Sequence, residues 1–287
     1  MEKLSDHKKG IAAILFAALL WSTGGVFIKL ISFNSLQLSF FRSLLSAITI
    51  LVLFRRRAVL FNTGTMINGL FYAAILILFV VAAKSTTVAN AIFLQYTAPI
   101  YVFILEPLML KTKFERINLI TILICIAGMF LFFAGDLSPG DKSGNLAAIL
   151  SGICFAGFLI GMRKNKPEYQ FATIFYGNVF ISLFCSFSVF ALNEIQATDV
   201  IMVSYLGIFQ IGLAYVIFSY GLKKVNAIEA SLISMIEPVL NPVWTYIGYG
   251  EVPSIYSIFG GLIIIAGLTI KTFQIEKSKF FKYFFKR

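Results

Sequence analysis

The sequence predicts an all-α polytopic membrane protein of about ten transmembrane helices, built as two inverted halves of five helices each. Three observations predict this fold. Hydrophobic residues make up 59% of the 287 positions and charged residues only 13%, whereas a soluble domain carries about 25% charged residues. Apolar windows of the length that a bilayer requires, about 20 residues, recur from Gly10 to Phe273. The two halves of the chain also resemble each other.

Ten apolar spans follow one another with short interruptions. We predict them at residues 10–32, 35–54, 65–83, 87–110, 117–134, 144–162, 170–192, 200–222, 226–248 and 254–273. Turn residues or clustered charges mark the breaks, as at Asn34-Ser35 and at the three arginines of 55–57. Residues 272–287 are predicted to form a basic tail.

Positive charge in the loops predicts the orientation. If the N-terminus is cytoplasmic, 20 of the 24 Lys and Arg residues fall on the cytoplasmic side, and only Lys29, Lys84 and Lys142 fall outside. Such a bias in short loops follows the positive-inside rule. We therefore predict a multi-pass protein of a bacterial inner membrane with both termini in the cytoplasm.

An internal repeat relates the two halves. A shift of 139 positions aligns three consecutive spans without a gap, and it pairs Pro99 with Pro238 and Gly128 with Gly267. Since each half has an odd number of spans, the second half must enter the membrane from the opposite face. Inverted repeats of this kind are typical of secondary transporters that work by alternating access.

Short motifs in the first, second, fourth and ninth spans carry a family resemblance. They are Leu20-Trp21-Ser22-Thr23-Gly24-Gly25, Phe41-Arg42, Leu94-Gln95-Tyr96-Thr97-Ala98-Pro99, Ile236-Glu237-Pro238-Val239 and Gly250-Glu251. With these motifs the sequence resembles the EamA family of the drug/metabolite transporter superfamily. The resemblance implies two EamA repeats, at 10–134 and 144–271. It also implies a central cavity surrounded by spans 1, 3, 4, 6, 8 and 9 and supported by spans 5 and 10.

The resemblance further implies export or exchange of small metabolites, amino acids or drugs without an ATP-hydrolysing domain. One motif departs from the family pattern. The acidic end that many members carry on the fourth span is here Lys111-Thr112-Lys113. A symmetric pair of acids at the ends of spans 4 and 9 is therefore not expected.

Ionisable residues inside apolar spans are costly, so by default they are functional or paired. Glu237 lies roughly 16 Å from the cytoplasmic start of its span, near the midplane of a ~30 Å core. We predict a substrate or coupling role for it, as a proton site or a counter-charge for an amine; a structural ion pair or hydrogen bond is the alternative. For Arg42 we favour a structural ion pair. Glu106 and Glu229 are expected at the interface, and His7 in a solvated tail.

The remaining candidate site residues supply a polar and aromatic cavity. Asn241 lies one turn from Glu237 on the same predicted face. Aromatic rings and amides suited to a small organic substrate come from Trp21, Tyr72, Gln95, Tyr96, Gln210 and Tyr215. Pro99 and Pro238 each remove a backbone hydrogen bond, so we predict kinks that free carbonyls in mid-membrane.

The sequence lacks a P-loop, an HExxH motif, a Gly-x-Ser-x-Gly motif and a Cys/His cluster, so we expect no enzyme, no metal and no cofactor. The net charge of +11 lies in loops rather than in a basic domain, which argues against nucleic-acid binding. The first hypothesis is a secondary carrier of a small molecule in the lipid bilayer; proton coupling and a homodimer are left open. The alternative is a non-transporting scaffold or a lipid- or ligand-binding sensor, which would need neither an inverted repeat nor a midplane acid.

Overall fold

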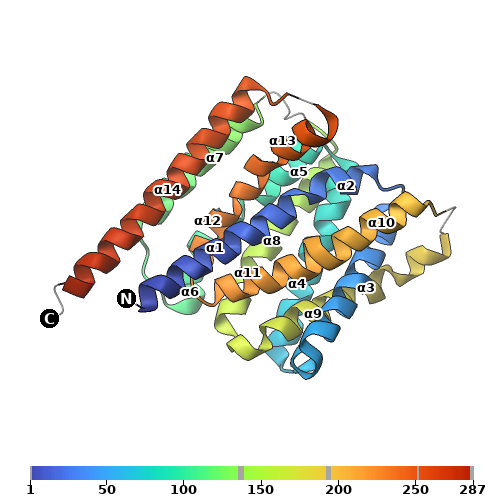
Figure 1. Ribbon diagram of the computed structural model, residues 1–287, viewed down its shortest axis with the longest axis horizontal. Helices are drawn as coiled ribbons and strands as arrows, with labels where there is room; N and C mark the ends of the chain where they lie inside the picture. Colours follow the sequence, from blue (N-terminus) through green and yellow to red (C-terminus); the bar gives the residue numbers. More distant parts are fainter. Residues whose placement is uncertain (1, 135–138, 192–194, 251, 285–287) are drawn as a thin grey trace.

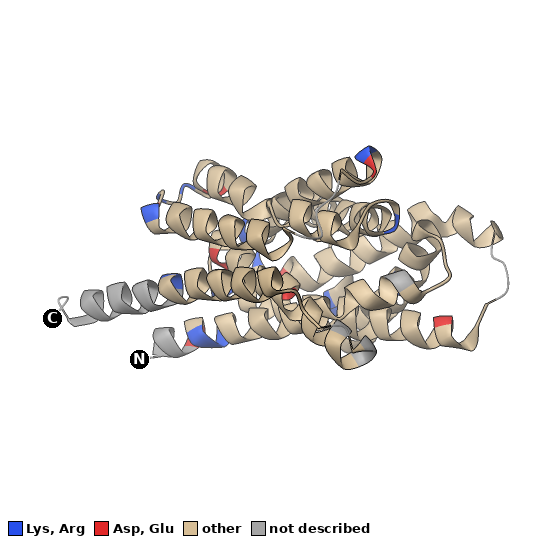
Figure 2. Cartoon of the chain, turned by 90° about the horizontal axis from the view of Figure 1, so that it is seen from above, with Lys and Arg blue, Asp and Glu red and all other residues tan. Residues whose placement is uncertain are grey.

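The computed structural model describes residues 2–134, 139–191, 195–250 and 252–284. Within these ranges the chain is built of helices and short connections, and no strand occurs (Figure 1). Both termini lie at one end of the bundle, which we call the termini end (Figure 1). Charged residues are sparse along the body of the bundle (Figure 2). The predicted all-α membrane class is confirmed.

The first half of the chain consists of α1 (Glu2–Ser22), α2 (Gly24–Leu30), α3 (Ser35–Phe54), the 3₁₀ turn η1 (Arg55–Val59), α4 (Thr63–Ser85), α5 (Val88–Gln95), α6 (Ala98–Leu110) and α7 (Arg116–Phe132). The second half consists of α8 (Lys142–Lys164), η2 (Pro167–Tyr169), α9 (Gln170–Cys185), η3 (Ser186–Ala191), α10 (Ala197–Tyr205), the π-helical η4 (Leu206–Leu213), α11 (Ala214–Leu222), α12 (Ala227–Ser234), α13 (Ile236–Tyr249) and α14 (Ile255–Phe284).

Among the residues that the structure describes, seven helical runs are long and apolar enough to cross a membrane, at the places of predicted spans 1–4 and 6–8. They are Asp6–Ile28, Ser35–Val59, Thr63–Ser85, Val88–Leu110, Lys142–Lys164, Pro167–Ala191 and Ala197–Leu222. Shorter apolar helices, Arg116–Phe132 and Ile255–Lys271, stand at spans 5 and 10. The broken pair α12 and α13 stands at span 9. The multi-pass architecture is thus established, and the full count of ten spans stays a prediction.

Helices from the two halves pack in matching pairs. α7 packs along α14, and α3 packs along α9. α4 packs along α8, and α1 packs along α11. In the internal repeat α1 corresponds to α8, α3 to α9, α4 to α11 and α7 to α14. Exchanging corresponding helices leaves the pairs α7–α14 and α3–α9 unchanged and converts the pair α4–α8 into the pair α11–α1. This is the pairing that a two-fold relation between the halves produces.

The α7–α14 pair is in backbone contact. A Cβ atom on Gly260 would lie 2.4 Å from the backbone nitrogen of Phe132 and 2.5 Å from the carbonyl oxygen of Gly128. Only glycine permits this approach. Within a bilayer the hydrophobic effect does not drive helices together, so they associate through close packing at small residues. The two helices therefore form a closely packed pair beside the rest of the bundle.

Candidate functional site

Spans 4 and 9 are interrupted at equivalent positions. The break between α5 and α6 falls at Tyr96, and the break between α12 and α13 falls at Met235, which is 139 positions later. Pro99 is the second residue of α6, and Pro238 is the third residue of α13. The prolines therefore lie directly after the interruptions, where the helical hydrogen-bond pattern restarts.

The break in span 4 is accommodated by the neighbouring helix. Because Pro99 has no N–H, the carbonyl of Gln95 loses its partner four residues on. Gly152 of α8 lies against that carbonyl, since a Cβ on Gly152 would stand 2.7 Å from the Gln95 oxygen. The Gln95 side chain also contacts α8, donating from Nε2 to Oγ of Ser151 at 2.8 Å. α8 thus holds the interrupted segment in place.

A third and a fourth irregularity lie beside these breaks. Span 1 is interrupted at Thr23, between α1 and α2, and span 8 contains the π-helical turn η4. Gln210 of η4 donates from Nε2 to the carbonyl of Trp21 at 3.4 Å. A Cβ on Gly24 would lie 2.5 Å from the same Nε2 atom, so Gly24 leaves room for this side chain. Irregular backbone at membrane depth is tolerated where it lines a cavity, and π turns often mark functional sites.

A small cavity of about 40 Å³ lies at this level, within a larger space of about 440 Å³ that is partly open to solvent. Its lining combines aromatic rings, amides and two groups of opposite charge type: Trp21, Arg42, Ile75, Leu76, Phe79, Gln95, Tyr96, Phe155, Gln210, Ile211, Tyr215 and Glu237. Six of the eight residues predicted for substrate or coupling thus meet in one cavity, together with Arg42. Tyr72 and Asn241 do not line it.

Glu237 is tied to the break in span 4. The hydroxyl of Tyr96 donates a hydrogen bond to the Glu237 carboxylate, and Tyr96 is itself buried. Glu237 is the second residue of α13, so this bond links the two interrupted spans across the cavity. The carboxylate is held by a neutral hydroxyl, and Glu237 forms no ion pair within the described part of the chain.

The aromatic wall of the cavity is formed by rings from different helices. The ring centroids of Trp21 and Tyr215 are 4.7 Å apart, and those of Trp21 and Phe218 are 4.9 Å apart. Tyr72 stands behind Tyr215 at 4.7 Å, with its hydroxyl accepting from Nδ2 of Asn178 at 3.0 Å. Tyr72 therefore supports the wall and does not face the cavity.

Arg42 does not form the ion pair that we favoured. Its side chain is buried, and Nη2 donates to the carbonyl of Leu76 at 3.1 Å. No ion pair of Arg42 occurs within the described part of the chain. The nearest candidate acid in depth, Glu237, is bound to Tyr96 instead. Arg42 is therefore a cavity cation held by one carbonyl.

Asn241 lies one helical turn beyond Glu237, away from the cavity. A Cβ on Gly25 of α2 would stand 3.7 Å from Asn241 Oδ1, so this amide faces α2. The same stretch of α13 is tied to α1, since Nε1 of Trp244 donates to Oγ of Ser22 at 2.8 Å. Asn241 thus belongs to the contact between α13 and the first span.

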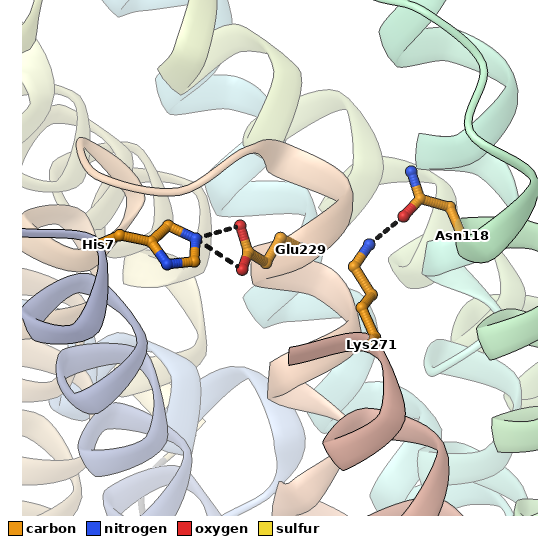
Figure 3. A network of polar contacts seen from close by, with 4 residues as sticks. All are labelled: His7, Asn118, Glu229 and Lys271. Atoms are coloured by element: carbon orange, nitrogen blue, oxygen red, sulfur yellow. Dashed lines mark hydrogen bonds and ion pairs between the residues drawn. The ribbon is translucent and has the colours of Figure 1, made fainter. Parts of the chain in front are cut away.

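A buried polar cluster at the termini end was missed (Figure 3). Nε2 of His7 lies 2.9 and 3.0 Å from the two carboxylate oxygens of Glu229, and both side chains are about 5% exposed. Beside them, Lys271 of α14 donates to Asn118 of α7 (Figure 3). The predictions of a solvated His7 and an interfacial Glu229 are wrong. α1 begins at Glu2, so the N-terminal segment is helical and packs onto α12.

Glu106 is likewise buried, at 3% exposure, and its interfacial placement is wrong. Its carboxylate accepts from the backbone nitrogens of Ala227 at 3.2 Å and Ile228 at 2.9 Å, in the first turn of α12. An acid from span 4 thus caps a helix of span 9, where the helix dipole favours negative charge. No local sequence pattern marks a cap that comes from 121 positions away.

The two halves of span 9 differ in packing. Every residue of α12 is buried. On α13, by contrast, large apolar side chains are exposed, including Val243, Tyr246 and Ile247. Span 9 is therefore enclosed by protein toward the termini end, whereas toward the opposite end it presents an apolar face that the rest of the protein does not cover.

The part of the chain that the structure describes contains no set of side chains suited to bind a metal ion. No group of three His, Cys, Asp or Glu side chains is placed to hold an ion there. The three cysteines are free, with Cys125 and Cys185 buried and Cys154 half-buried. They pack in separate helices and share no site.

Comparisons with known proteins show which proteins this chain resembles. The model of the EamA-like transporter family matches residues 8–134 and again residues 142–273. A protein named "Uncharacterized transporter" from Archaeoglobus fulgidus is 28% identical over 267 residues, which cover 91% of this chain and 95% of that protein. The human protein named "Solute carrier family 35 member G1" is 22% identical, over 90% of this chain and 77% of that protein.

A solved crystal structure also superposes on the chain. The TM-score is 0.74 at 16% sequence identity, over 92% of this chain and 96% of the other. At that identity the likeness concerns the fold alone. The two matches of the family model cover most of the sequence, and so the chain belongs to the EamA-like transporter family and is a multi-pass membrane transporter.

Proposed function

We propose that this transporter is a secondary carrier of small organic solutes that works by alternating access, with the central cavity as the solute site and Glu237 as the coupling acid. The observation that carries the proposal is the placement of a single carboxylate, hydrogen-bonded to Tyr96, in a cavity at the level where spans 4 and 9 are both broken. Discontinuous helices at mid-membrane form the solute and ion sites of many secondary transporters.

The packing of span 9 supports a definite conformational state. α12 is buried on all sides, and its first turn is capped by Glu106 and pinned to α1 by the pair His7 and Glu229. The positive-inside rule assigns this termini end to the cytoplasm. We infer that the described conformation is closed toward the cytoplasm and that α13, whose apolar face is not covered by protein, is the segment that moves at the outer end.

Two inverted repeats, at 10–134 and 144–271, are the proposed moving units in a bacterial inner membrane. The matching helix pairs support a two-fold relation between them. A carrier of this design needs no cofactor, catalytic group or nucleic acid. It draws on a gradient, with a proton on Glu237 as the proposed coupling ion and export or exchange as the proposed direction. A homodimer is not required, since the cavity is complete within one chain.

The first test is gradient-driven transport in proteoliposomes, with Glu237→Gln as the variant. A solute is first found by thermal shift against pooled amino acids, nucleobases, sugar phosphates and organic cations. A ligand present at 100 times its dissociation constant stabilises the folded state by about 2.7 kcal/mol. We expect Glu237→Gln to lose uptake driven by a pH gradient, while solute exchange at equal pH persists.

The matched control is Glu115→Gln, which removes an exposed carboxylate far from the cavity and should leave gradient-driven uptake unchanged. Full gradient-driven uptake by Glu237→Gln would contradict the coupling role. Ligand binding without any transport by the wild type would instead favour the sensor or scaffold alternative.

A further inference from the structure

A second pocket, which we call the loop pocket, lies outside the central cavity. It is formed by the end of α6, the connection from α6 to α7 and the start of α12. Asn118 lines it and belongs to the buried cluster at the termini end (Figure 3). Its volume is about 360 Å³, within a space of about 820 Å³, against about 40 Å³ for the central cavity. Small-molecule sites usually measure about 300–1,000 Å³, so the loop pocket has the size of a binding site.

Two cationic side chains of the loop pocket are unpaired. Lys111 and Lys113 line the pocket and are exposed, and their side chains make no hydrogen bond or ion pair within the described residues. Two acids also line the pocket. Glu106 is engaged in capping α12, and Glu115 lies within ion-pair distance of neither lysine. Each free ammonium group therefore offers its three N–H donors to an anion that enters the pocket.

The backbone of Lys111 supports a role for its side chain. Lys111 ends α6 with φ 53° and ψ 33°, in the left-handed region. Glycine or asparagine usually occupies this position of a helix, because a longer side chain there is strained. Strained residues concentrate at ligand sites. The strained lysine keeps a cation at the pocket, where glycine would end the helix without strain.

An unused amide reaches the loop pocket from another part of the chain. Asn226 is the N-cap residue of α12, a position at which asparagine normally caps the helix. Its side chain makes no capping hydrogen bond, and the first two amides of α12 donate to Glu106 instead. Asn226 lines the pocket, so its amide is available to a ligand. The polar groups of the pocket thus come from two segments that Glu106 ties together.

The loop pocket lies where a membrane span ends and its apolar surface begins. The apolar run of span 4 ends at Leu110, directly before Lys111. On the adjoining surface Leu108 is 69% exposed, and the exposed ring of Phe114 packs edge-on against Phe103 with 5.5 Å between the centroids. Exposed apolar side chains at the end of a membrane span contact acyl chains. A lipid on this surface would bring its headgroup to the two lysines.

We infer that the loop pocket binds the phosphate of an anionic phospholipid. The ammonium groups of Lys111 and Lys113 bind the phosphate oxygens, the amide of Asn226 donates a further hydrogen bond, and the acyl chains lie along the exposed surface of α6. Basic pockets between membrane helices bind lipid headgroups in this way. Glu115 takes no part in these contacts and weakens the attraction for a free anion, which favours a ligand that the bilayer holds at high local concentration.

Native mass spectrometry of the full chain, purified in detergent and stripped of lipid, tests the inference with three probes. Dioleoylphosphatidylglycerol carries both the phosphate and the chains, and we expect it to bind. Dioleoylglycerol carries the same chains without the phosphate, and its affinity should be at least about tenfold lower, as expected for the loss of a charged hydrogen-bonding group. Inorganic phosphate carries the charge without the chains, and it should not displace the bound lipid.

A matched pair of double variants places the phosphate. Lys111→Gln with Lys113→Gln should lower the affinity for dioleoylphosphatidylglycerol roughly thirtyfold, because each lysine near an anionic lipid contributes a factor of about five. The control is Arg56→Gln with Arg57→Gln, which removes two exposed charges from the loop between spans 2 and 3, on the same predicted side of the membrane. It should leave the affinity unchanged. All four side chains are exposed, so we expect both variants to fold.

Equal losses of affinity in the two double variants would show that lipid binding follows overall charge, and would overturn the loop pocket as the site. Equal binding of dioleoylglycerol, or no binding of dioleoylphosphatidylglycerol to the wild type, would overturn phosphate recognition. Displacement by inorganic phosphate would assign the pocket to a soluble anion and overturn the lipid. The comparison of the three probes needs no variant, and none of these outcomes depends on transport of a solute.

Discussion

Glu106→Gln is expected to destabilise the protein at a distance from the cavity, because the carboxylate accepts two backbone N–H groups of α12. Both amides are buried at the start of a helix and have no intrahelical acceptor. A glutamine side chain keeps one oxygen, which can accept from Ala227 or from Ile228, and turns an NH₂ group toward the other amide. The substitution therefore leaves one buried donor unsatisfied.

The magnitude follows from two contributions. An unsatisfied buried amide costs about 1–3 kcal/mol, and loss of a negative charge at a helix N-terminus adds about 1 kcal/mol. We expect the free energy of unfolding to fall by about 2–4 kcal/mol. Glu106→Ala, which removes both acceptors, should cost more than Glu106→Gln.

Equilibrium unfolding in mixed detergent micelles measures this loss. Glu115→Gln is the matched control, since Glu115 is exposed and makes no side-chain cap on α7. Its effect should stay within about 0.5 kcal/mol, the usual range for an exposed site. A Glu106→Gln protein as stable as the control would refute the capping role of Glu106.

Two further perturbations address the closure at the termini end and the cavity. In a double-mutant cycle, His7→Ala and Glu229→Gln should be coupled by about 1 kcal/mol or more in unfolding free energy, because the two side chains form a buried pair; additive effects would show that they do not interact. Gly24→Ala places a methyl group 2.5 Å from the flexible Gln210 amide, so it should reduce solute affinity with little loss of melting temperature, whereas Gly25→Ala, whose nearest contact is 3.7 Å, should change neither. Equal affinities of the two glycine variants would count against a role of Gln210 in the cavity.

The sequence predicted the features that depend on local pattern. Apolar windows of bilayer length located the helical runs, since that pattern needs no knowledge of neighbours. Depth along a span predicted that Glu237 lies near the midplane of the bilayer. Gln95, Tyr96 and Tyr215 were predicted at the cavity because they fall in spans that the family resemblance places around it. Helical depth and the family resemblance together therefore predicted most of the residues that line the cavity.

The sequence could not predict which side chains pair across the bundle. Glu106 and Glu229 lie near span ends, where depth alone favours the interface, yet both are buried against other helices. His7 looked solvated because nothing in the tail shows that α1 extends to meet α12. Partner choice depends on the rotation of each helix about its axis, which tertiary packing sets. The structural ion pair that we favoured for Arg42 does not form, for the same reason.

The interruption of span 9 at Met235 would allow its two segments, α12 and α13, to move independently of each other. Since the regular helix already stops there and Pro238 offers no N–H to rejoin it, α13 can tilt without unwinding a continuous helix. In the proposed alternating-access cycle, α12 would stay anchored by groups from two other helices while α13 moves. Under the proposed mechanism, opening one side of the barrier would leave the contacts on the other side intact, so no continuous leak would form between the two compartments.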